Sequence, residues 1–251
     1  MPLEKLSKKI TSKISHLIGF KKNQNSSEDL IASIIHQVKQ LEPADSLKFL
    51  FHLEKAIYSL QGQQAILYGR GIHTKHKHTQ YHKFFTDNIK EGELVLDIGC
   101  GNGALTFDLA QKTNHGLVYG IDLVAGNIDQ AQKNFKRKNI TYLWGDALKD
   151  LPDKKFDTIV MSNVLEHLEK RVEFLRQIKK NYQPKKIILR VPLFERDWRV
   201  PLQEELGLDY RLDQTHFIEY KQAEFWAEMQ AAGLKPLITK IVWGEIWTVV
   251  K

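Results

Sequence analysis

The sequence predicts an α/β fold in which short apolar strands and helices alternate around a mostly parallel sheet. Four apolar runs, 94–98, 117–121, 140–144 and 156–161, are each followed by a glycine, an acid or a serine. Helical spacing of apolar residues follows the first run and recurs before and after the group of strands. This arrangement is typical of parallel sheets covered by helices rather than of sandwiches or helical bundles.

The first strand leads into a glycine loop. Its sequence, 94–103, places Asp97 near the end of the strand and then glycines at alternate positions. These loop residues are Gly99, Cys100, Gly101 and Gly103. Glycines let the backbone turn sharply and lie bare against a bulky ligand. The helix that starts at Ala104 offers free N–H groups and a positive dipole end, so this segment predicts a site for a nucleotide-type cofactor.

Polar residues at later strand ends decide between cofactor classes. The glycines alone also fit the Gly-x-Gly-x-x-Ala spacing of dinucleotide-binding loops. Asp97, however, takes a position where a dinucleotide strand normally carries an apolar residue. Asp122 closes the second run, where it can accept hydrogen bonds from ribose hydroxyls. Asp146 lies in a Gly-Asp-Ala turn after the third run, and the fourth leads into Ser-Asn-Val-Leu-Glu-His-Leu at 162–168.

In this order and spacing, the four strand ends resemble the class I S-adenosylmethionine-dependent methyltransferases, over about 94–191. The resemblance implies a Rossmann-like, seven-stranded, mostly parallel sheet with helices on both faces and an antiparallel last strand. It also implies an enzyme with S-adenosyl-L-methionine as cofactor, S-adenosyl-L-homocysteine as product, and in-line methyl transfer to an acceptor.

The cofactor contacts that the resemblance implies all lie at these strand ends. Asp97 with Gly99–Gly103 would surround the methionine, and Asp122 with Leu123 would hold the ribose. Asp146 with Ala147 would contact the adenine, and Ser162 with Asn163 would lie near the sulfonium. Two simpler interpretations stay open. Asp97 could cap the helix or turn that follows it, and Asp146 could cap a short turn before Leu148.

Three residues in loops beyond the strand ends are candidates for a general base. Holding nucleophile, methyl carbon and sulfur in line supplies most of the acceleration, but a hydroxyl acceptor also needs a group that takes its proton. The candidates are His167 after the fourth strand, Asp197 after the fifth, and His216 in a late polar loop. His216 has the best position for this role, whereas His167 has the alternative of packing near the cofactor.

Substrate contacts are expected from two segments that flank the cofactor strands. In the family, the segment before the glycine loop covers the cofactor, so its histidines and tyrosine are candidates for a lid. The candidates from both segments are His73, His78, Tyr81, His82, Arg190, Trp198, Arg199 and Tyr220. Plain surface exposure is the alternative for the lid residues. Lysines lie between the histidines and no cysteine is near them, so no metal is expected.

The turn after the fourth strand narrows the chemical class of the methyl acceptor. Methyltransferases that act on amino groups of adenine or glutamine often carry Asn/Asp-Pro-Pro-Tyr there, whereas this chain has Ser-Asn-Val-Leu at 162–165. The preferred interpretation is O-methylation of a small molecule, a sugar or a lipid-linked intermediate. The alternatives are an RNA methyltransferase that uses 75–83 and 196–199 as a basic footprint, and a non-catalytic binding module. Nucleic acid is disfavoured because residues 1–22 carry six lysines against one glutamate, most of the net charge of +7.

The N-terminus is predicted to be a basic amphipathic helix over 1–20, with its apolar stripe at 3–18, followed by a polar linker at 21–28. This helix either lies on an anionic membrane surface or docks on its own domain or a partner subunit. The sequence shows neither a secretory signal nor an apolar run long enough for a transmembrane helix. A cytoplasmic location is therefore expected, with peripheral membrane contact left open.

Two domains follow the linker. A helical accessory or lid region is expected over 29–90, with two helices on either side of Pro43 and a glycine-marked loop from Gly62. The methyltransferase domain is expected over 91–251, with a substrate-side insertion at 192–220.

The C-terminal half of the domain is expected to complete the sheet. A helix over 172–182 precedes a fifth strand at 186–191, and a helix at 222–232 ends at a glycine that suits a C-cap. Two last apolar runs, 237–242 and 246–250, predict a hairpin that closes the sheet.

Overall fold

The computed structural model describes residues 27–70, 72–151 and 153–251, which fall into two compact units. One unit runs to Gln64 and the other from Ala65 to Lys251. The basic helix expected over 3–18, and the linker up to residue 26, lie outside the described residues.

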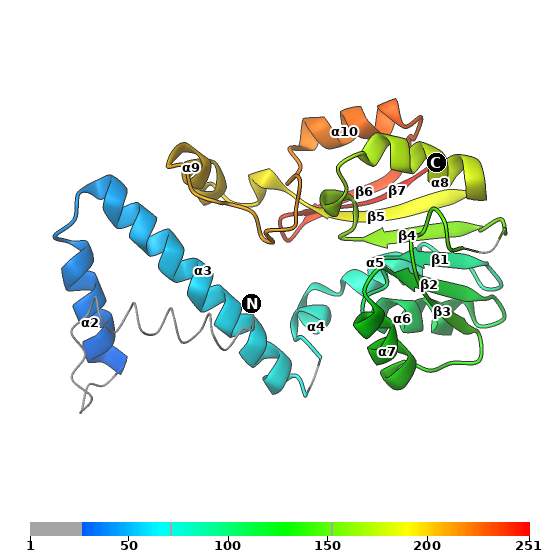
Figure 1. Cartoon of the computed structure of the whole chain (residues 1–251), viewed down its shortest axis with the longest axis horizontal. Helices are drawn as coiled ribbons and strands as arrows, with labels where there is room; N and C mark the ends of the chain where they lie inside the picture. The colour runs from blue at the N-terminus through cyan, green and yellow to red at the C-terminus, as the bar shows by residue number, and fades with distance from the viewer. Residues whose placement is uncertain (1–26, 71, 152) are drawn as a thin grey trace. The chain divides into compact units, whose positions relative to one another are not determined.

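The described part of the first unit contains two helices, α2 (Ser27–Val38) and α3 (Pro43–Tyr68), and α3 continues into the second unit (Figure 1). α2 begins two residues earlier than expected, with Glu28 and Asp29 in its first turn, where acidic side chains interact favourably with the helix dipole. Pro43 is the first residue of α3, a position at which the missing N–H of proline would have no partner in any case.

The loop expected from Gly62 is wrong, because α3 runs through this glycine and ends just before Gly69. A single glycine costs a helix roughly 1 kcal/mol relative to alanine. The glutamine, alanine and leucine residues around it are strong helix formers, and together they outweigh that cost.

Gly62→Ala is expected to raise the free energy of unfolding by roughly 0.5–1 kcal/mol, because alanine suits a helix interior and restricts the unfolded chain. Thermal and urea unfolding followed by circular dichroism measures the change. Gly69→Ala is the matched control of opposite sign, since its Cβ would collide with the carbonyl oxygen of Ile72. A Gly62→Ala variant less stable than the parent chain would contradict the continuous helix.

The second unit is built on a seven-stranded sheet with the strand order β3-β2-β1-β4-β5-β7-β6. The strands are β1 (Val95–Ile98), β2 (Val118–Asp122), β3 (Ile140–Trp144), β4 (Thr158–Ser162), β5 (Lys186–Pro192), β6 (Pro236–Val242) and β7 (Glu245–Val250). β7 is antiparallel to both of its neighbours, and the other strands run parallel to one another. The fold class predicted from the sequence is therefore confirmed.

Helices cover both faces of this sheet (Figure 1). The helices of the unit are α4 (Lys75–Thr79), α5 (Tyr81–Asp87), α6 (Ala104–Thr113), α7 (Ala125–Asn134), α8 (Arg171–Tyr182), α9 (Arg199–Glu205) and α10 (Gln222–Ala231), with 3-10 turns η1 (Leu165–His167) and η2 (Phe194–Arg196). α5 and α6 bury their apolar side chains on one face, against residues such as Val160 and Ile188. α8 and α10 cover the other face. There they pack against residues such as Ile159 and Ile187, which precede Val160 and Ile188 in the strands.

The middle of the sheet is apolar on both sides, as expected for parallel strands between two helix layers. All four residues of β1, including Asp97, are buried, and β4 and β5 are buried over most of their length. By contrast, β6 lies at an edge and is largely exposed. None of the helices in the described ranges combines the length and apolar character needed to cross a bilayer.

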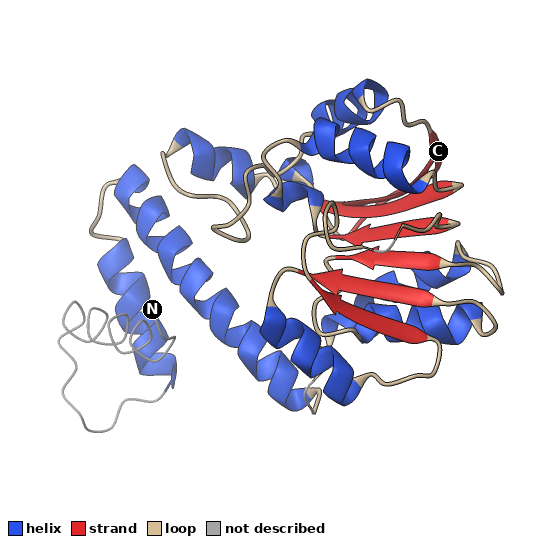
Figure 2. Ribbon diagram, turned by 45° about the vertical axis from the view of Figure 1, so that its right-hand side comes forward, coloured by secondary structure: helices blue, strands red, loops and turns tan. Residues whose placement is uncertain are grey.

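The strand order places a crevice where a ligand can bind. The chain proceeds outward from β1 through β2 to β3, and then returns to the other side of β1 with β4 and β5. In open parallel sheets, ligands bind at the carboxyl ends of the strands at such a switch point. The arrowheads of the central strands in Figure 2 point to this end of the sheet.

Candidate cofactor and acceptor site

The glycine loop, residues 99–103, lies at the switch point between β1 and α6. Its three glycines all have positive φ, which other residues rarely adopt. A Cβ atom at Gly99 or Gly103 would come within 2.7 Å of a neighbouring side chain. A Cβ atom at Gly101 would meet nothing within 4 Å, so this residue presents bare backbone to open space. The loop therefore offers a main-chain surface to a ligand at Gly101.

Asp97 lies beneath this loop, in β1, and only 1% of it is exposed. One of its carboxylate oxygens accepts a hydrogen bond from the Thr106 hydroxyl at 2.7 Å. Burial raises the pKa of Asp97 to about 7, although the Thr106 bond opposes this shift. The N-cap of α6 is Gly103, so Asp97 does not cap that helix. Ionising this buried carboxylate costs free energy. A cationic group of a ligand bound nearby would stabilise the ionised form.

Asp122 ties the end of β2 to the glycine loop. One carboxylate oxygen accepts the Gly101 N–H at 2.9 Å, and the other accepts the Val124 N–H at 2.9 Å and the Asn127 side-chain amide at 3.1 Å. The carboxylate therefore fixes both the loop and the start of α7. Leu123, the next residue, is 72% exposed.

Asp146, in the turn after β3, caps that turn. Its carboxylate accepts the Leu148 N–H at 2.8 Å and pairs with Lys149 at 3.0 Å, and the Leu148 bond is the main cause of its lowered pKa. Within the chain, Asp146 therefore caps the short turn before Leu148, which was the simpler interpretation of its position in the sequence. Ala147, beside it, is buried.

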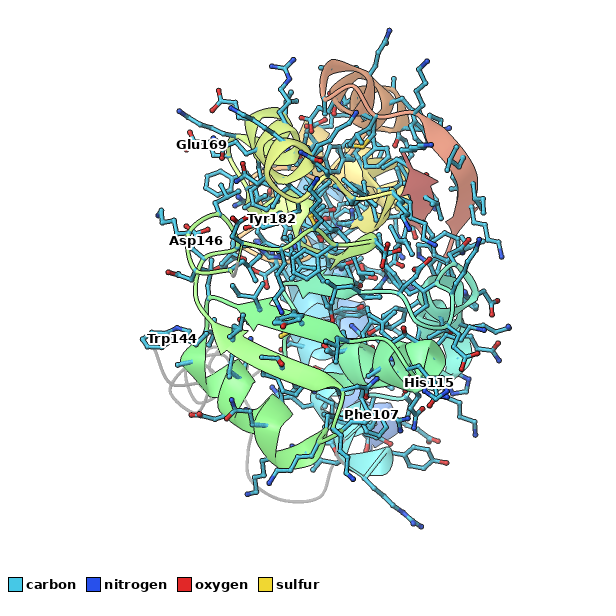
Figure 3. The ribbon with its side chains drawn as sticks, turned by 90° about the vertical axis from the view of Figure 1, so that its right-hand side faces the viewer. Phe107, His115, Trp144, Asp146, Glu169 and Tyr182 are labelled. Carbon is cyan, nitrogen blue, oxygen red and sulfur yellow. The ribbon has the colours of Figure 1, made fainter. Side chains whose placement is uncertain are left out.

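Trp144, at the end of β3, was missed by sequence reasoning. Its side chain is 68% exposed, and its indole N–H donates to the carbonyl oxygen of Leu123 at 3.1 Å. Figure 3 shows Trp144 and Asp146 on the same side of the domain. A flat aromatic surface therefore lies close to the end of β2, where the ribose and adenine contacts are expected. Its position at the end of an apolar run, next to the Gly-Asp-Ala turn, is the sequence signal that could have identified Trp144 as a site residue.

The residue that follows β4 has a left-handed backbone conformation. Asn163 has a φ of 57° and a buried side-chain oxygen that lacks a hydrogen-bond partner. A non-glycine residue at positive φ costs free energy and is enriched at functional sites. The hydroxyl oxygen of Ser162 lies 3.3 Å from an Arg190 nitrogen. Ser162 and Asn163, the two residues predicted to lie near the sulfonium, are therefore at the switch point, one strand from the glycine loop.

Arg190, predicted to contact substrate, is a buried anchor between elements. It donates to Glu245 of β7 at 2.7 Å, and its guanidinium carbon lies 4.0 Å from the centre of the Tyr81 ring. Only 7% of Arg190 is exposed. Because its charge is paired with Glu245, it positions Tyr81 and Ser162 rather than meeting an acceptor freely.

A hydrogen-bonded network links the lid segment to α6. His76 Nδ1 lies 3.1 Å from His82 Nε2 and 3.1 Å from the Tyr81 hydroxyl, and His82 Nδ1 lies 2.6 Å from Asp108. Burial, followed by the neighbouring His82, lowers the pKa of His76 to about 4, so its ring is neutral at pH 7. The sequence pointed to Tyr81 and His82 but missed His76 and Asp108. Asp108 contacts His82 across 26 residues of chain.

The histidines proposed as general bases lie next to each other. The rings of His167 and His216 are 4.6 Å apart and nearly perpendicular. His167 Nδ1 lies 2.9 Å from the Thr215 hydroxyl, and His216 Nδ1 lies 3.2 Å from Glu219. Burial and the adjacent His167 lower the pKa of His216 to about 4. Two loops that are 48 residues apart in sequence thus form one polar site beyond β4.

The other predicted residues lie outside this pair. Asp197 is held by Arg199 at 2.7 Å, which lowers its pKa to about 2 and makes it a weak proton acceptor. Trp198 is 73% exposed, whereas Tyr220 is fully buried and donates to Glu228 at 2.8 Å. Of the two remaining lid histidines, His78 is exposed, and His73 Nδ1 accepts the Lys75 N–H. Tyr220 therefore has no exposed surface with which it could contact an acceptor.

The comparisons with known proteins agree with this geometry. Residues 89–201 match a family model described as a methyltransferase domain. The matched segment, a little under half of the chain, therefore carries a methyltransferase domain, as the resemblance to the class I S-adenosylmethionine-dependent methyltransferases predicted. The family predicted from the sequence is therefore confirmed, and S-adenosylmethionine is the cofactor of this family.

The curated relatives match the methyltransferase domain in part. (S)-tetrahydroprotoberberine N-methyltransferase of Eschscholzia californica is 31% identical over 93 residues, 36% of this chain and 27% of that protein. Aklanonic acid methyltransferase DauC of Streptomyces sp. (strain C5) is 41% identical over 76 residues, 28% of this chain and 34% of that protein. The chain thus spans about a quarter to a third of the length of these relatives.

Solved structures share the fold of the methyltransferase domain. Magnesium protoporphyrin IX methyltransferase of Synechocystis PCC 6803, with bound SAH, has a TM-score of 0.54 at 21% identity and covers 69% of this chain and 82% of that one. Mitomycin 7-O-methyltransferase MmcR has a TM-score of 0.57 at 16% identity, with 74% and 56% covered. At these identities the likeness shows the fold alone.

Proposed function

We propose that this protein transfers a methyl group from S-adenosylmethionine to an oxygen atom of a small molecule, a sugar or a lipid-linked acceptor. The observation that carries the proposal is the open backbone face at Gly101, between Asp97 and Asp122, at the switch point of the sheet. Both acids fit a cofactor that is cationic at its sulfonium and amino groups and carries ribose hydroxyls.

The residues fit the cofactor from one end to the other. Asp97 and the glycine loop would hold the methionine, and Asp122 would hold the ribose. Ala147 and the flat face of the Trp144 ring would hold the adenine. The unpartnered oxygen of Asn163 would face the sulfonium, which supplies an electrophilic methyl group when bound. A partner for this oxygen would remove the cost of leaving it buried and unpaired.

An oxygen acceptor suits the polar site beyond β4. A hydroxyl must lose its proton as it attacks the methyl carbon, and a neutral imidazole within reach can take it. The His167–His216 pair supports this role better than Asp197, whose carboxylate is held by Arg199. The residues Ser162–Leu165, in place of Asn/Asp-Pro-Pro-Tyr, further support oxygen over an aromatic amino group.

The surrounding segments would complete the acceptor site. We place the lid at α4 and α5, where the His76–His82–Asp108 network fixes Tyr81 against Arg190. The insertion 192–220 supplies His216 on the other side. The segment 3–18, predicted from the sequence to be a basic amphipathic helix, would serve membrane contact.

Asp122→Ala is expected to weaken binding of S-adenosylmethionine roughly 10–100-fold, because it removes a charged acceptor for ribose hydroxyls and releases the Gly101 N–H. Isothermal calorimetry with the cofactor and with S-adenosylhomocysteine measures the loss. Asp129→Ala, an exposed acid on α7, is the matched control and should bind as the parent does. Equal losses in both variants, or a parent chain that binds neither ligand, would refute the proposal.

The oxygen specificity is tested separately. Cofactor labelled with carbon-13 in its methyl group is incubated with phenol, sugar hydroxyl, carboxylate and amine acceptors, and the product methyl is read by its NMR shift. O-methyl products support the proposal, and products methylated only on nitrogen contradict it.

A further inference from the structure

Glu166, His167 and His216 form a compact cluster beyond the end of β4, named here the Glu-His-His cluster. One carboxylate oxygen and one ring nitrogen from each histidine all lie within 4.8 Å of one another. Glu166 and His167 come from η1, directly after β4, and His216 comes from the loop before α10. Phe217 N–H donates to the backbone oxygen of Glu166 at 2.8 Å, which fastens the two segments together.

The side chain of Glu166 receives no hydrogen bond from any other residue of the described chain. Its side chain is completely buried, and both of its oxygens have no hydrogen-bond donor. Among buried side-chain atoms of the described residues, only Asn163 Oδ1 shares this condition. Burying a carboxylate without a partner is expensive, and such groups are normally paired or bound to a metal.

The hydrogen bonds of the histidines leave one nitrogen of each ring with a free lone pair. Glu219, which is also paired with Arg196, can only accept, so His216 must donate through Nδ1. The Thr215 hydroxyl donates its single hydrogen to Asp213 at 2.7 Å, so His167 must donate to Thr215 through Nδ1. In a neutral ring held in this way, the free lone pair lies on Nε2. This is the tautomer in which histidines bind metals, with the outer nitrogen held by a carboxylate or hydroxyl.

We propose that Glu166, His167 and His216 bind one divalent transition-metal ion through the carboxylate and the two Nε2 atoms. Two imidazoles and a carboxylate form a donor set that suits zinc and neighbouring first-row metals. Ligand atoms around a tetrahedral ion with bonds of about 2.0–2.1 Å lie roughly 3.4 Å apart. One ligand atom of each residue now lies within 4.8 Å of the others, so binding requires a contraction of up to roughly 1.4 Å, which rotation of side chains can supply.

The use of this ion in catalysis rests on the proposed function. Three protein ligands leave a coordination position for the acceptor oxygen, and coordination lowers the pKa of a hydroxyl. The proton passes to water, the oxygen forms its bond to the methyl carbon, and the carbon–sulfur bond breaks with its electron pair on sulfur. This role replaces the general base, because a bound Nε2 atom cannot take a proton. It also departs from the sequence-based expectation that no metal is present.

Titration of the full-length, metal-free protein with Co²⁺ tests the site without any methyl acceptor. The parent chain is expected to bind a single equivalent with visible d–d bands, and Zn²⁺ should displace it. His216→Ala and Glu166→Gln should each weaken Co²⁺ binding by roughly tenfold or more. His78→Ala, in the exposed histidine-rich segment, is the matched control and should leave binding and spectrum unchanged.

Cofactor binding by each variant is measured in parallel, which shows that the variant is folded and separates the two proposals. A parent chain that binds S-adenosylhomocysteine but takes up no Co²⁺ overturns the metal site and leaves the proposed function standing. Co²⁺ uptake that survives Glu166→Gln and His216→Ala but is lost in His78→Ala also overturns it. Metal uptake without cofactor binding would instead overturn the proposed function.

Discussion

Gly101→Val is expected to abolish detectable binding of S-adenosylmethionine and S-adenosylhomocysteine while the domain remains folded. The added side chain meets no atom of the protein within 4 Å, so it projects into the space assigned to the cofactor. The strain of a β-branched residue at a φ of 54° costs roughly 1–3 kcal/mol, which a folded domain can tolerate. Calorimetry measures binding, and thermal unfolding measures the strain.

Gly92→Val is the matched control for this prediction. Gly92 also has a positive φ and nothing within 4 Å of a built Cβ, but it precedes β1, at the other end of that strand. The two variants should therefore lose similar stability, and only Gly101→Val should lose the cofactor. Near-normal cofactor affinity in Gly101→Val would show that the ligand does not lie against the loop.

Asp97→Asn is expected to stabilise the protein at pH 8 and to weaken its cofactor binding. The pKa of Asp97 is raised from 3.8 to about 7 by burial, so between these values the folded state keeps a proton that the unfolded chain has lost. The free energy of unfolding contributed by this group therefore falls as the pH rises through that window, by roughly 4 kcal/mol at most. Asparagine keeps an oxygen for the Thr106 hydroxyl but has no charge to desolvate.

Urea unfolding at a series of pH values compares the parent chain with Asp97→Asn. The difference in free energy of unfolding should be small near pH 4 and should grow in favour of the variant up to about pH 7–8. Cofactor binding, measured on the same samples, should be weakened because the cationic groups lose their carboxylate. A variant that is less stable than the parent at pH 8, or that binds the cofactor normally, contradicts the assignment.

The features that sequence could predict are those specified by nearby residues. Strands, the glycine loop and the acids at strand ends lie within runs of about ten residues, and their spacing alone places Asp97 and Asp122 at one edge of the sheet. The same spacing placed the hairpin at the end of the chain, because β6 and β7 are separated by a short turn. Gly62 shows the limit of local signals, since its helix-forming neighbours outweighed the glycine.

Side-chain roles that depend on distant partners could not be predicted in this way. Arg190 was expected at the substrate, but its pairing with Glu245 depends on β7 lying beside β5, 55 residues later in the chain. Glu166 was visible in the Glu-His motif, yet its lack of a partner becomes apparent only when the packing around it is known. His216 was chosen for its polar loop, and its contact with His167 depends on how that loop folds back.

The position of β7 between β5 and β6 also sets an order for assembly on the ribosome. β6 is synthesised first, but it joins the sheet only through β7, so it has no place to pair until the last strand has emerged. Glu245 of β7 arrives at the same moment and neutralises Arg190, which in turn holds Tyr81 and Ser162. A nascent chain can therefore complete the glycine loop early, whereas Tyr81 and Ser162 are held in place by Arg190 and Glu245 only after β7 has been synthesised.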